Sequence, residues 1–398
     1  MNGYTNQQKE KMEEEALRKA VDELDCETLP TANIMVAGIT GTGKSTLLNA
    51  VFSSDLAATG TGKPVTDQIA EYDSPNIPIH IWDTVGLELD SEKTKESIRA
   101  IRDTIANKSA SDDHFDRIHA IWYCINSGSN RYQGAELDFI RALHSIGVPF
   151  IIVLTQCIGD DDEINAFEKK IKSINASMDM RDIEIVQVLA MDKKTKKYTI
   201  EAFGLDELVN ITTKKLPDFI KGGFVAAQNV TKVQKRDYCG EILVKYTDAA
   251  ISGFWDKVPI VNVFTTDKKI HRMFSEIGKI YNSIIPEDRV KEIIDCMGSM
   301  DLEHGFFGII FPVNKKFDQR VDDLFGKKMQ EGFDVPWKNL ENKERVARML
   351  VYFGYLFLES VEELWEKRNE DMLKDIDKRV QLLKGMLSEK FNMKKARG

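Results

Sequence analysis

Short apolar runs alternate with amphipathic helical patterns over the first half of the chain, from about residue 33 to residue 216. The runs predict six β-strands: "NIMVA" (33–37), "IAEYD" (69–73), "IPIHIWD" (77–83), "HAIWYCI" (119–125), "PFIIVLT" (149–155) and "IEIVQVL" (183–189). The patterns between them predict helices over 45–52, 93–106, 134–146, 162–176 and 206–215. Near-continuous apolar strands separated by helices predict an α/β fold, with a mainly parallel six-stranded sheet covered on both faces. Only "SPN" joins the second and third strands, so these two should form an antiparallel pair.

The hydrophobic pattern becomes purely helical in the second half of the chain. We therefore expect three parts: an N-terminal amphipathic helix within 1–30, the α/β domain over 31–217 and an all-α domain over 218–398. One uncharged run of the last part, "MLVYFGYLFL" (349–358), is shorter than a bilayer-spanning helix requires. It predicts a buried core helix, with a membrane element as the alternative.

Composition narrows the expected partners and compartment. The 398 residues carry a formal net charge of −9, so the chain as a whole repels nucleic acid, and we expect such contact only through a larger assembly. Five cysteines without metal-binding or paired spacing are typical of reduced thiols in a cytoplasmic protein. The polar, charged N-terminus is unlike a signal peptide, and no apolar stretch reaches the length of a membrane span. We therefore expect a soluble, cytoplasmic protein.

A glycine-rich motif lies between the first predicted strand and the first predicted helix. "GITGTGKST" (38–46) matches G-x-x-x-x-G-K-[ST], in which glycines let backbone N–H groups surround a phosphate at the positive end of a helix. Lys44 is expected to reach the β- and γ-phosphates and to act in catalysis, and Ser45 to place its hydroxyl on Mg²⁺. The expected nucleotide contacts of this loop are Gly41, Thr42, Gly43, Lys44, Ser45 and Thr46.

The pentapeptide "TGTGK" occurs twice, at 40–44 and at 59–63. No apolar strand precedes the second copy, and Lys63 is followed by Pro64 where a phosphate loop needs Ser or Thr. We therefore expect the second copy to form a loop that leaves phosphate binding to the first. It leads into Thr66, just before the second predicted strand.

A third motif, "WDTVG" (82–86), stands at the end of the third predicted strand. Asp83 is placed there to hold Mg²⁺ through water, and Gly86 to offer its backbone N–H to the γ-phosphate. A lone D-x-x-G is weak evidence, but its spacing after the glycine-rich loop strengthens it. Together the motifs predict a site for a Mg²⁺–nucleotide complex.

"GITGTGKSTLLNAVF", "GKPVT" and "DTVGL" resemble the translation-factor class of P-loop GTPases, and within it the Era-like branch, near the tRNA-modification and immunity-related GTPases. The resemblance covers about 33–216 and implies Mg²⁺-dependent binding of GTP and its hydrolysis to GDP and phosphate. It also implies that Thr66 belongs to a mobile switch, where its hydroxyl and carbonyl meet Mg²⁺ and the γ-phosphate, as a metal ligand and a catalytic residue. Residues 249–282 are similar to a poorly characterised helical domain of some Era-like proteins.

The chain departs from the family pattern beside the γ-phosphate. Leu87 stands where small Ras-like GTPases carry a glutamine that orients the attacking water, so we expect slow hydrolysis. By analogy with tRNA-modification GTPases, Glu88 or Asp90 would supply the catalytic water contact. The alternative is that both are ordinary charged loop residues.

A second departure concerns the base. The family reads guanine with N/T-K-x-D, whereas this chain has "TQCI" (155–158), with Gln156 for the lysine and Ile158 for the aspartate. A carboxylate from "DDD" (160–162) could replace the aspartate, or these residues could simply begin a helix. The guanine preference therefore comes from the resemblance. The expected base-side contacts are Thr155, Gln156, Leu189 and Ala190.

Three functions fit these observations. The first is a slow regulatory GTPase switch that couples guanine nucleotide to a helical effector domain and, through it, to an unknown protein effector. The second is a dynamin-like or immunity-related GTPase, with nucleotide-dependent self-association and peripheral contact with a membrane. The third is a nucleotide-binding adaptor with little hydrolysis, or with relaxed base specificity that admits ATP.

Overall fold

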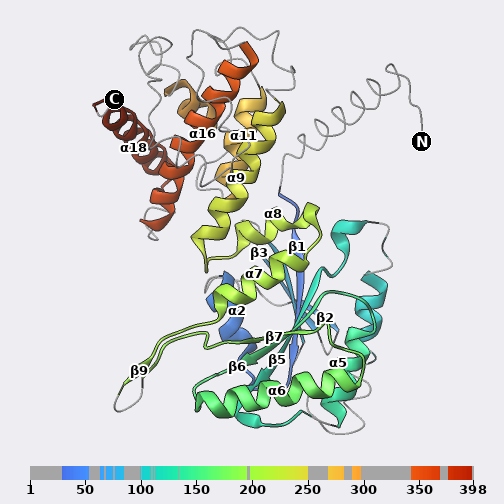
Figure 1. Cartoon of the computed structure of the whole chain (residues 1–398). Coiled ribbons are helices and arrows are strands. Elements are labelled where there is room, and N and C mark those ends of the chain that lie inside the picture. Colours follow the sequence, from blue (N-terminus) through green and yellow to red (C-terminus); the bar gives the residue numbers. More distant parts are fainter. Residues whose placement is uncertain are drawn as a thin grey trace, which may run out of the picture. The chain divides into compact units, whose positions relative to one another are not determined.

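The computed structural model divides into two compact units (Figure 1). One is Pro30–Tyr238, and the other combines Met1–Leu29 with Cys239–Gly398. The residues that the structure describes are 29–52, 63–66, 69–74, 77–84, 99, 101–108, 111, 113–132, 134–194, 198–249, 268–281, 289–296, 342–367 and 375–396. The helix expected within 1–30 falls almost wholly outside this description.

The first unit is built on a seven-stranded sheet in the order β2-β3-β4-β1-β5-β6-β7. Its strands are β1 (Ala32–Gly38), β2 (Lys63–Thr66), β3 (Ile69–Ser74), β4 (Ile77–Thr84), β5 (Ala120–Asn126), β6 (Phe150–Thr155) and β7 (Glu184–Gln187). β1 pairs in parallel with β4 and β5, and β6 pairs in parallel with β5 and β7. β3 and β4 are antiparallel, so all six predicted strands and the predicted antiparallel pair are confirmed.

The strand absent from the prediction is β2, at the edge of the sheet. We expected Lys63–Thr66 to be loop, but its backbone pairs antiparallel with β3, with a register shift between Pro64 and Thr66. Proline lacks an N–H and is accommodated on an edge strand, and the β-branched residues after it suit an extended backbone. Thr66 therefore lies at the end of a strand.

Helices cover both faces of the sheet and complete an α/β/α sandwich (Figure 1). One face packs against α2 (Lys44–Phe52), α7 (Leu205–Lys215) and α8 (Asp218–Ala227). The other packs against α5 (Ala135–His144), α6 (Asp161–Ser177) and the helical residues 101–108. Because β1, β5 and β6 are buried on both faces, their sequences are continuously apolar rather than alternating.

The first unit extends beyond the predicted boundary at 217, because α8 packs on the sheet. Ile220 and Phe224 belong to the same apolar core as β1 and β4. Gly223 lies so close to the chain before β1 that a Cβ there would stand 1.8 Å from the Pro30 carbonyl oxygen. α9 (Lys232–Ala249) then begins inside this unit and continues past Tyr238 into the second.

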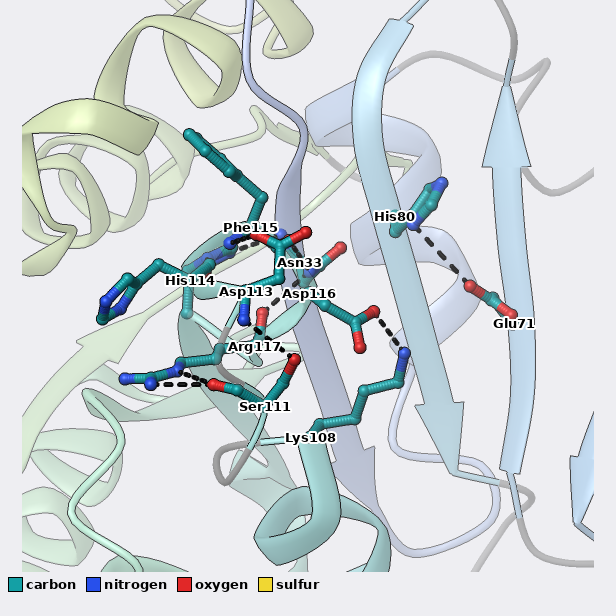
Figure 2. Close-up of polar contacts among 11 residues, drawn as sticks. Asn33, Glu71, His80, Lys108, Ser111, Asp113, His114, Phe115, Asp116 and Arg117 are labelled. Atoms are coloured by element: carbon teal, nitrogen blue, oxygen red, sulfur yellow. Dashed lines mark hydrogen bonds and ion pairs between the residues drawn. The ribbon is translucent and has the colours of Figure 1, made fainter.

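A short loop fastens the start of β5 to the start of β1 (Figure 2). It contains the 3-10 turn η1 (His114–Asp116). The Asn33 side chain donates to the backbone oxygens of Phe115, at 2.8 Å, and Arg117, at 2.7 Å. The backbone N–H of Asn33 donates to Nδ1 of His119 at 2.9 Å, and burial lowers the pKa of that imidazole, which is therefore neutral. These bonds hold the starts of β1 and β5 together. Because the two strands are parallel, their carboxyl ends lie at the same edge of the sheet.

The second unit contains the rest of α9, α11 (Lys268–Ile280), α16 (Asn342–Glu366) and α18 (Ile376–Ala396). Phe274 of α11 meets Phe357 of α16 edge to face at 4.7 Å between ring centroids. A Cβ at Gly354 would lie 2.3 Å from the Leu243 side chain, so α16 and α9 are in close contact there. The apolar run 349–358 lies in α16 and is buried from 350 onward, as predicted for a core helix. Among the described helices, none has the length and apolarity needed to cross a bilayer.

Candidate functional site

A cavity of about 700 Å³ opens at the carboxyl ends of β1, β4 and β6. This is the edge at which open α/β sheets bind ligands. We call one side of it the loop end, lined by Thr40, Gly41, Gly43, Lys44, Ser45, Thr46, Tyr72, Asp83 and Thr84. We call the other side the distal end, lined by Thr155, Gln156, Ile158, Leu189, Ala190, Met191 and Lys193.

The glycine-rich loop has a backbone that only glycine accommodates well. Gly38 ends β1 with φ 147°, and a Cβ there would lie 2.5 Å from the carbonyl oxygen of Cys124 in β5. Gly43 has φ 86° and accepts, through its carbonyl, the first bond of the following helix from Leu47 N–H at 2.9 Å. The chain therefore turns tightly out of the strand and directs the N-terminus of α2 at the cavity.

Lys44 carries the positive charge of the loop end. Its ammonium donates to the backbone oxygens of Gly38 at 3.0 Å and Ile39 at 3.4 Å. The Lys44 side chain is only 8% exposed, yet it lines the cavity, so the loop surrounds most of this side chain. A phosphate that entered here would meet this ammonium and the free N–H groups of the helix start.

Asp83 lies at the end of β4 on the other side of the loop end. Its Oδ1 is buried and has no hydrogen-bond partner among the described residues. Burial raises the pKa of this carboxyl to about 6, and the nearby Lys44 ammonium opposes the shift. Ser45, exposed in the first turn of α2, lines the same cavity. A buried acceptor without a partner, beside a free hydroxyl, fits Mg²⁺, which takes few protein oxygens and keeps water and phosphate as its other ligands.

Two residues at the end of β6, Thr155 and Gln156, fasten the loop to this strand. The Thr155 hydroxyl lies 2.5 Å from the Thr42 carbonyl oxygen and 3.1 Å from that of Ile125. The Gln156 side-chain amide donates to the Gly41 carbonyl oxygen at 2.8 Å. Gln156 adopts a left-handed backbone, φ 54°, which turns its side chain back over the loop. Gln156 also lines the cavity, so its amide holds the loop while the contact expected with the base stays a prediction.

The distal end is largely apolar. Leu189 and Ala190, for which base contacts are expected, line it, and Ile158, 45% exposed, also lines the cavity. Asp160, which was considered as a replacement base-reading carboxylate, is the N-cap of α6 and accepts from Asp162 N–H at 2.9 Å. The simpler interpretation of "DDD", as the start of a helix, is therefore the one that the structure supports.

Several predicted site residues lie elsewhere or outside the described residues. The Thr42 side chain bonds within the loop, to the Ile39 carbonyl at 2.9 Å, and does not line the cavity, because the turn needs that hydroxyl. Thr66 is described only through its backbone in β2. Gly86 and Glu88 fall outside the description. Conversely, sequence reasoning missed Thr40, Tyr72, Thr84, Met191 and Lys193 as lining residues.

Comparison with known proteins points to one class of nucleotide-binding domain. Residues 33–156 match the protein family described as "50S ribosome-binding GTPase". No curated protein matches the chain significantly. The matched segment begins in β1, includes the glycine-rich loop and Asp83, and ends at Gln156. These residues are therefore part of a GTP-binding P-loop G domain related to that family of GTPases.

Several solved structures match just under half of the chain at low sequence identity. A bacterial selenocysteine-specific elongation factor, EF-Sec, is 20% identical with a TM-score of 0.31, over 47% of this chain and 28% of that one. A probable GTP-binding protein, engB, is 18% identical with a TM-score of 0.31, over 46% of this chain and 98% of that one. The elongation factor SelB from Methanococcus maripaludis, with a GTP analogue, is 19% identical with a TM-score of 0.31, over 47% of this chain and 34% of its own. The match thus spans about a third or less of both elongation factors.

Proposed function

We propose that the chain is a slow regulatory GTPase, which binds GTP with Mg²⁺, hydrolyses it to GDP and phosphate, and signals its nucleotide state through the helical unit. The observation that carries the proposal is the loop end of the cavity. There the Lys44 ammonium sits within a glycine-rich loop at a helix N-terminus, opposite the unpartnered carboxylate oxygen of Asp83. A triphosphate needs a cation, backbone donors and a metal-binding carboxylate, and the loop end supplies all three.

Different residues of the chain would bind the phosphates, hold Mg²⁺ and orient the attacking water. Lys44 would leave its two loop carbonyls and bind the terminal phosphates, while the loop's N–H groups orient them. Ser45, Asp83 through water, and Thr66 would hold Mg²⁺, which offsets charge on the phosphates when bound. The backbone N–H of Gly86 would meet the γ-phosphate, and Glu88 or Asp90 would orient water in place of the missing glutamine.

One contact supports coupling between the nucleotide loop and the helix that leads to the second unit. Asn229, between α8 and α9, donates from its backbone to the Val51 carbonyl at 2.8 Å and from its side chain to the Phe52 carbonyl at 3.0 Å. These carbonyls belong to the last turn of α2, whose first turn carries Lys44 and Ser45. A shift of α2 on nucleotide exchange would therefore be passed to the start of α9.

Single-turnover hydrolysis of Mg²⁺–GTP, measured beside equilibrium binding of GTP and GDP, tests this function. We expect tight binding of both, turnover much slower than binding, and no turnover without Mg²⁺.

Thr66→Ala should retain GDP affinity but weaken the binding of a non-hydrolysable GTP analogue and slow hydrolysis, because its proposed contacts involve the γ-phosphate and Mg²⁺. Equal losses for GDP and the analogue would remove Thr66 from the switch. GTP binding with no turnover would favour the adaptor alternative.

A further inference from the structure

A nucleotide whose phosphates lay at the loop end would place its base against the distal end of the cavity. Guanine presents donors at N1 and at its 2-amino group, and acceptors at O6 and N7, whereas adenine replaces O6 by an amino donor. A protein that reads the N1 and 2-amino donors needs an acceptor beside them, and a carboxylate is the strongest one. Among the described lining residues, Asp83 supplies the only carboxylate, and it stands at the loop end. An exposed Ile158 offers the base an apolar side chain.

Two carboxylates near the distal end, Asp160 and Asp192, are occupied by local structure. Asp160 caps α6 through its bond from the Asp162 N–H at 2.9 Å. Asp192 accepts from the backbone N–H of Ala202 at 2.8 Å and so closes the base of a small hairpin. Neither of these side chains lines the cavity. Turning Asp160 toward a base would leave the α6 N-terminus without its side-chain cap, which destabilises the helix.

The same hairpin brings a cation to the distal end. Lys193 is the first residue of β8 (Lys193–Lys194), which pairs with β9 (Thr199–Ile200) to form the hairpin. A backbone bridge between Leu189 and Phe203 joins the two segments that lead into and out of it. Lys193 lines the cavity, whereas Lys194, its exposed neighbour, does not. An ammonium only donates hydrogen bonds, so it favours the O6 acceptor of a 6-oxopurine and disfavours the 6-amino group of adenine, whereas N7 is an acceptor in both.

We propose that this site, if it binds nucleotide as proposed above, selects 6-oxopurine nucleotides as a class: Lys193 reads the 6-oxo group, and the 2-amino group is left unread beside Ile158. Guanosine and inosine nucleotides differ only in that 2-amino group, so they should bind alike. Inosine and adenosine nucleotides differ at the 6-position, so they should be distinguished.

Calorimetric titration of the full-length protein with Mg²⁺ and with GDP, IDP or ADP tests the proposal directly. We expect GDP and IDP affinities within about threefold of each other, and ADP weaker than IDP by about fivefold or more, as for loss of one good base contact. A GDP preference over IDP above about 30-fold would overturn the proposal, because an acceptor would then be reading the 2-amino group. Equal IDP and ADP affinities would overturn it as well. Failure of all three to bind would instead refute the nucleotide site itself.

Two variants assign the effect to residues. Ile158→Asp, at a side chain that is 45% exposed and therefore tolerant of a charge, should raise the GDP-to-IDP affinity ratio to about tenfold or more by supplying the missing acceptor. Lys193→Ala should bring the IDP-to-ADP ratio toward one, while the matched control Lys194→Ala leaves it unchanged. An unchanged GDP-to-IDP ratio in Ile158→Asp, or equal effects of the two lysine variants, would contradict the assignment.

Discussion

The loop end of the cavity presents a glycine-rich backbone and a few charged groups, whereas the distal end presents mostly apolar side chains and one exposed lysine. Hydrogen bonds hold the glycine-rich loop in place: the Lys44 ammonium donates to two of its carbonyls, and Gln156 and Thr155 bond to the Gly41 and Thr42 carbonyls. At the distal end, Ile158, Met191 and Lys193 are all exposed. The backbone of the loop end is held in one arrangement, which suits the phosphates of the proposed nucleotide. The distal end is free to vary in what it accepts.

This difference explains why the sequence identifies the phosphate loop but does not by itself identify the base. Phosphate binding requires a particular backbone path, and this path is encoded by closely spaced glycines. Base reading needs only one or two side chains at the correct positions, and different residues can provide them. The predictions below test each end separately, starting with the largest expected effect.

Removal of the loop end's cation should abolish nucleotide binding. Lys44→Ala deletes the ammonium that lies 3.0 Å from the Gly38 carbonyl, and we expect Mg²⁺–GDP affinity to fall about 100-fold or more, since a charge-assisted contact in a partly buried site is lost. Lys63→Ala, in the second "TGTGK", is the matched control and should stay within a few-fold of wild type. Comparable losses in both variants, measured by calorimetry, would refute the assignment of phosphate binding to the first copy alone.

Acid should weaken the Mg²⁺-dependent part of binding at the loop end. Because the pKa of Asp83 is raised to about 6, the carboxylate that would hold Mg²⁺ becomes protonated just below neutral pH. We expect the Mg²⁺-dependent gain in nucleotide affinity to fall by about tenfold per pH unit below 6, as one proton competes with the metal. Asp83→Asn should remove both the gain and its pH dependence. A gain that is constant between pH 5 and 8 would exclude Asp83 from the metal site.

In the nucleotide-free protein, the ionised Asp83 side chain should lower the free energy of unfolding. The pKa of Asp83 is higher in the folded state than its ordinary value of 3.8, so the folded state favours the protonated form. This contribution to stability is complete below about pH 4 and is lost as the pH rises through about 6. Without nucleotide, Asp83→Asn should therefore raise the free energy of unfolding at pH 7 by about 1–3 kcal/mol. Chemical denaturation at pH 4 and pH 7 measures the difference.

The sequence alone predicts those features of the fold and site that follow from local backbone requirements. It does not predict features that depend on a contact between distant parts of the chain. The six strands, the Lys44 loop and the Asp83 position follow from apolar periodicity and motif spacing, since both reflect backbone requirements. The strand β2, the inclusion of α8 in the first unit, and the turning of Gln156 onto Gly41 do not. Each of these depends on a tertiary contact: an edge of the sheet, the Pro30 carbonyl, or a left-handed residue after β6.

The contact between the two ends should have an intermediate effect. Gln156→Ala removes the bond to the Gly41 carbonyl, and we expect all nucleotides to bind about three- to tenfold more weakly, because one hydrogen bond that orders the loop is lost. Gln156→Lys retains a donor at this position and should largely restore binding. Since the proposed role is to hold the loop, the ratio of GDP to IDP affinity should not change in either variant. A changed ratio would show that Gln156 contacts the base.

The smallest expected effect on binding is at Asp160, and it is the most informative about the distal end. Asp160→Asn keeps a good N-cap for α6 but removes the negative charge, so we expect unchanged stability and unchanged GDP-to-IDP selectivity. Asp160→Ala removes the cap and should lower the free energy of unfolding by about 1 kcal/mol, again without changing selectivity. If instead both variants reduced GDP affinity selectively, Asp160 would have left its cap to read the base when nucleotide binds. The distal end would then be as specific for guanine as the loop end is for phosphate, and the contrast between the two ends would disappear.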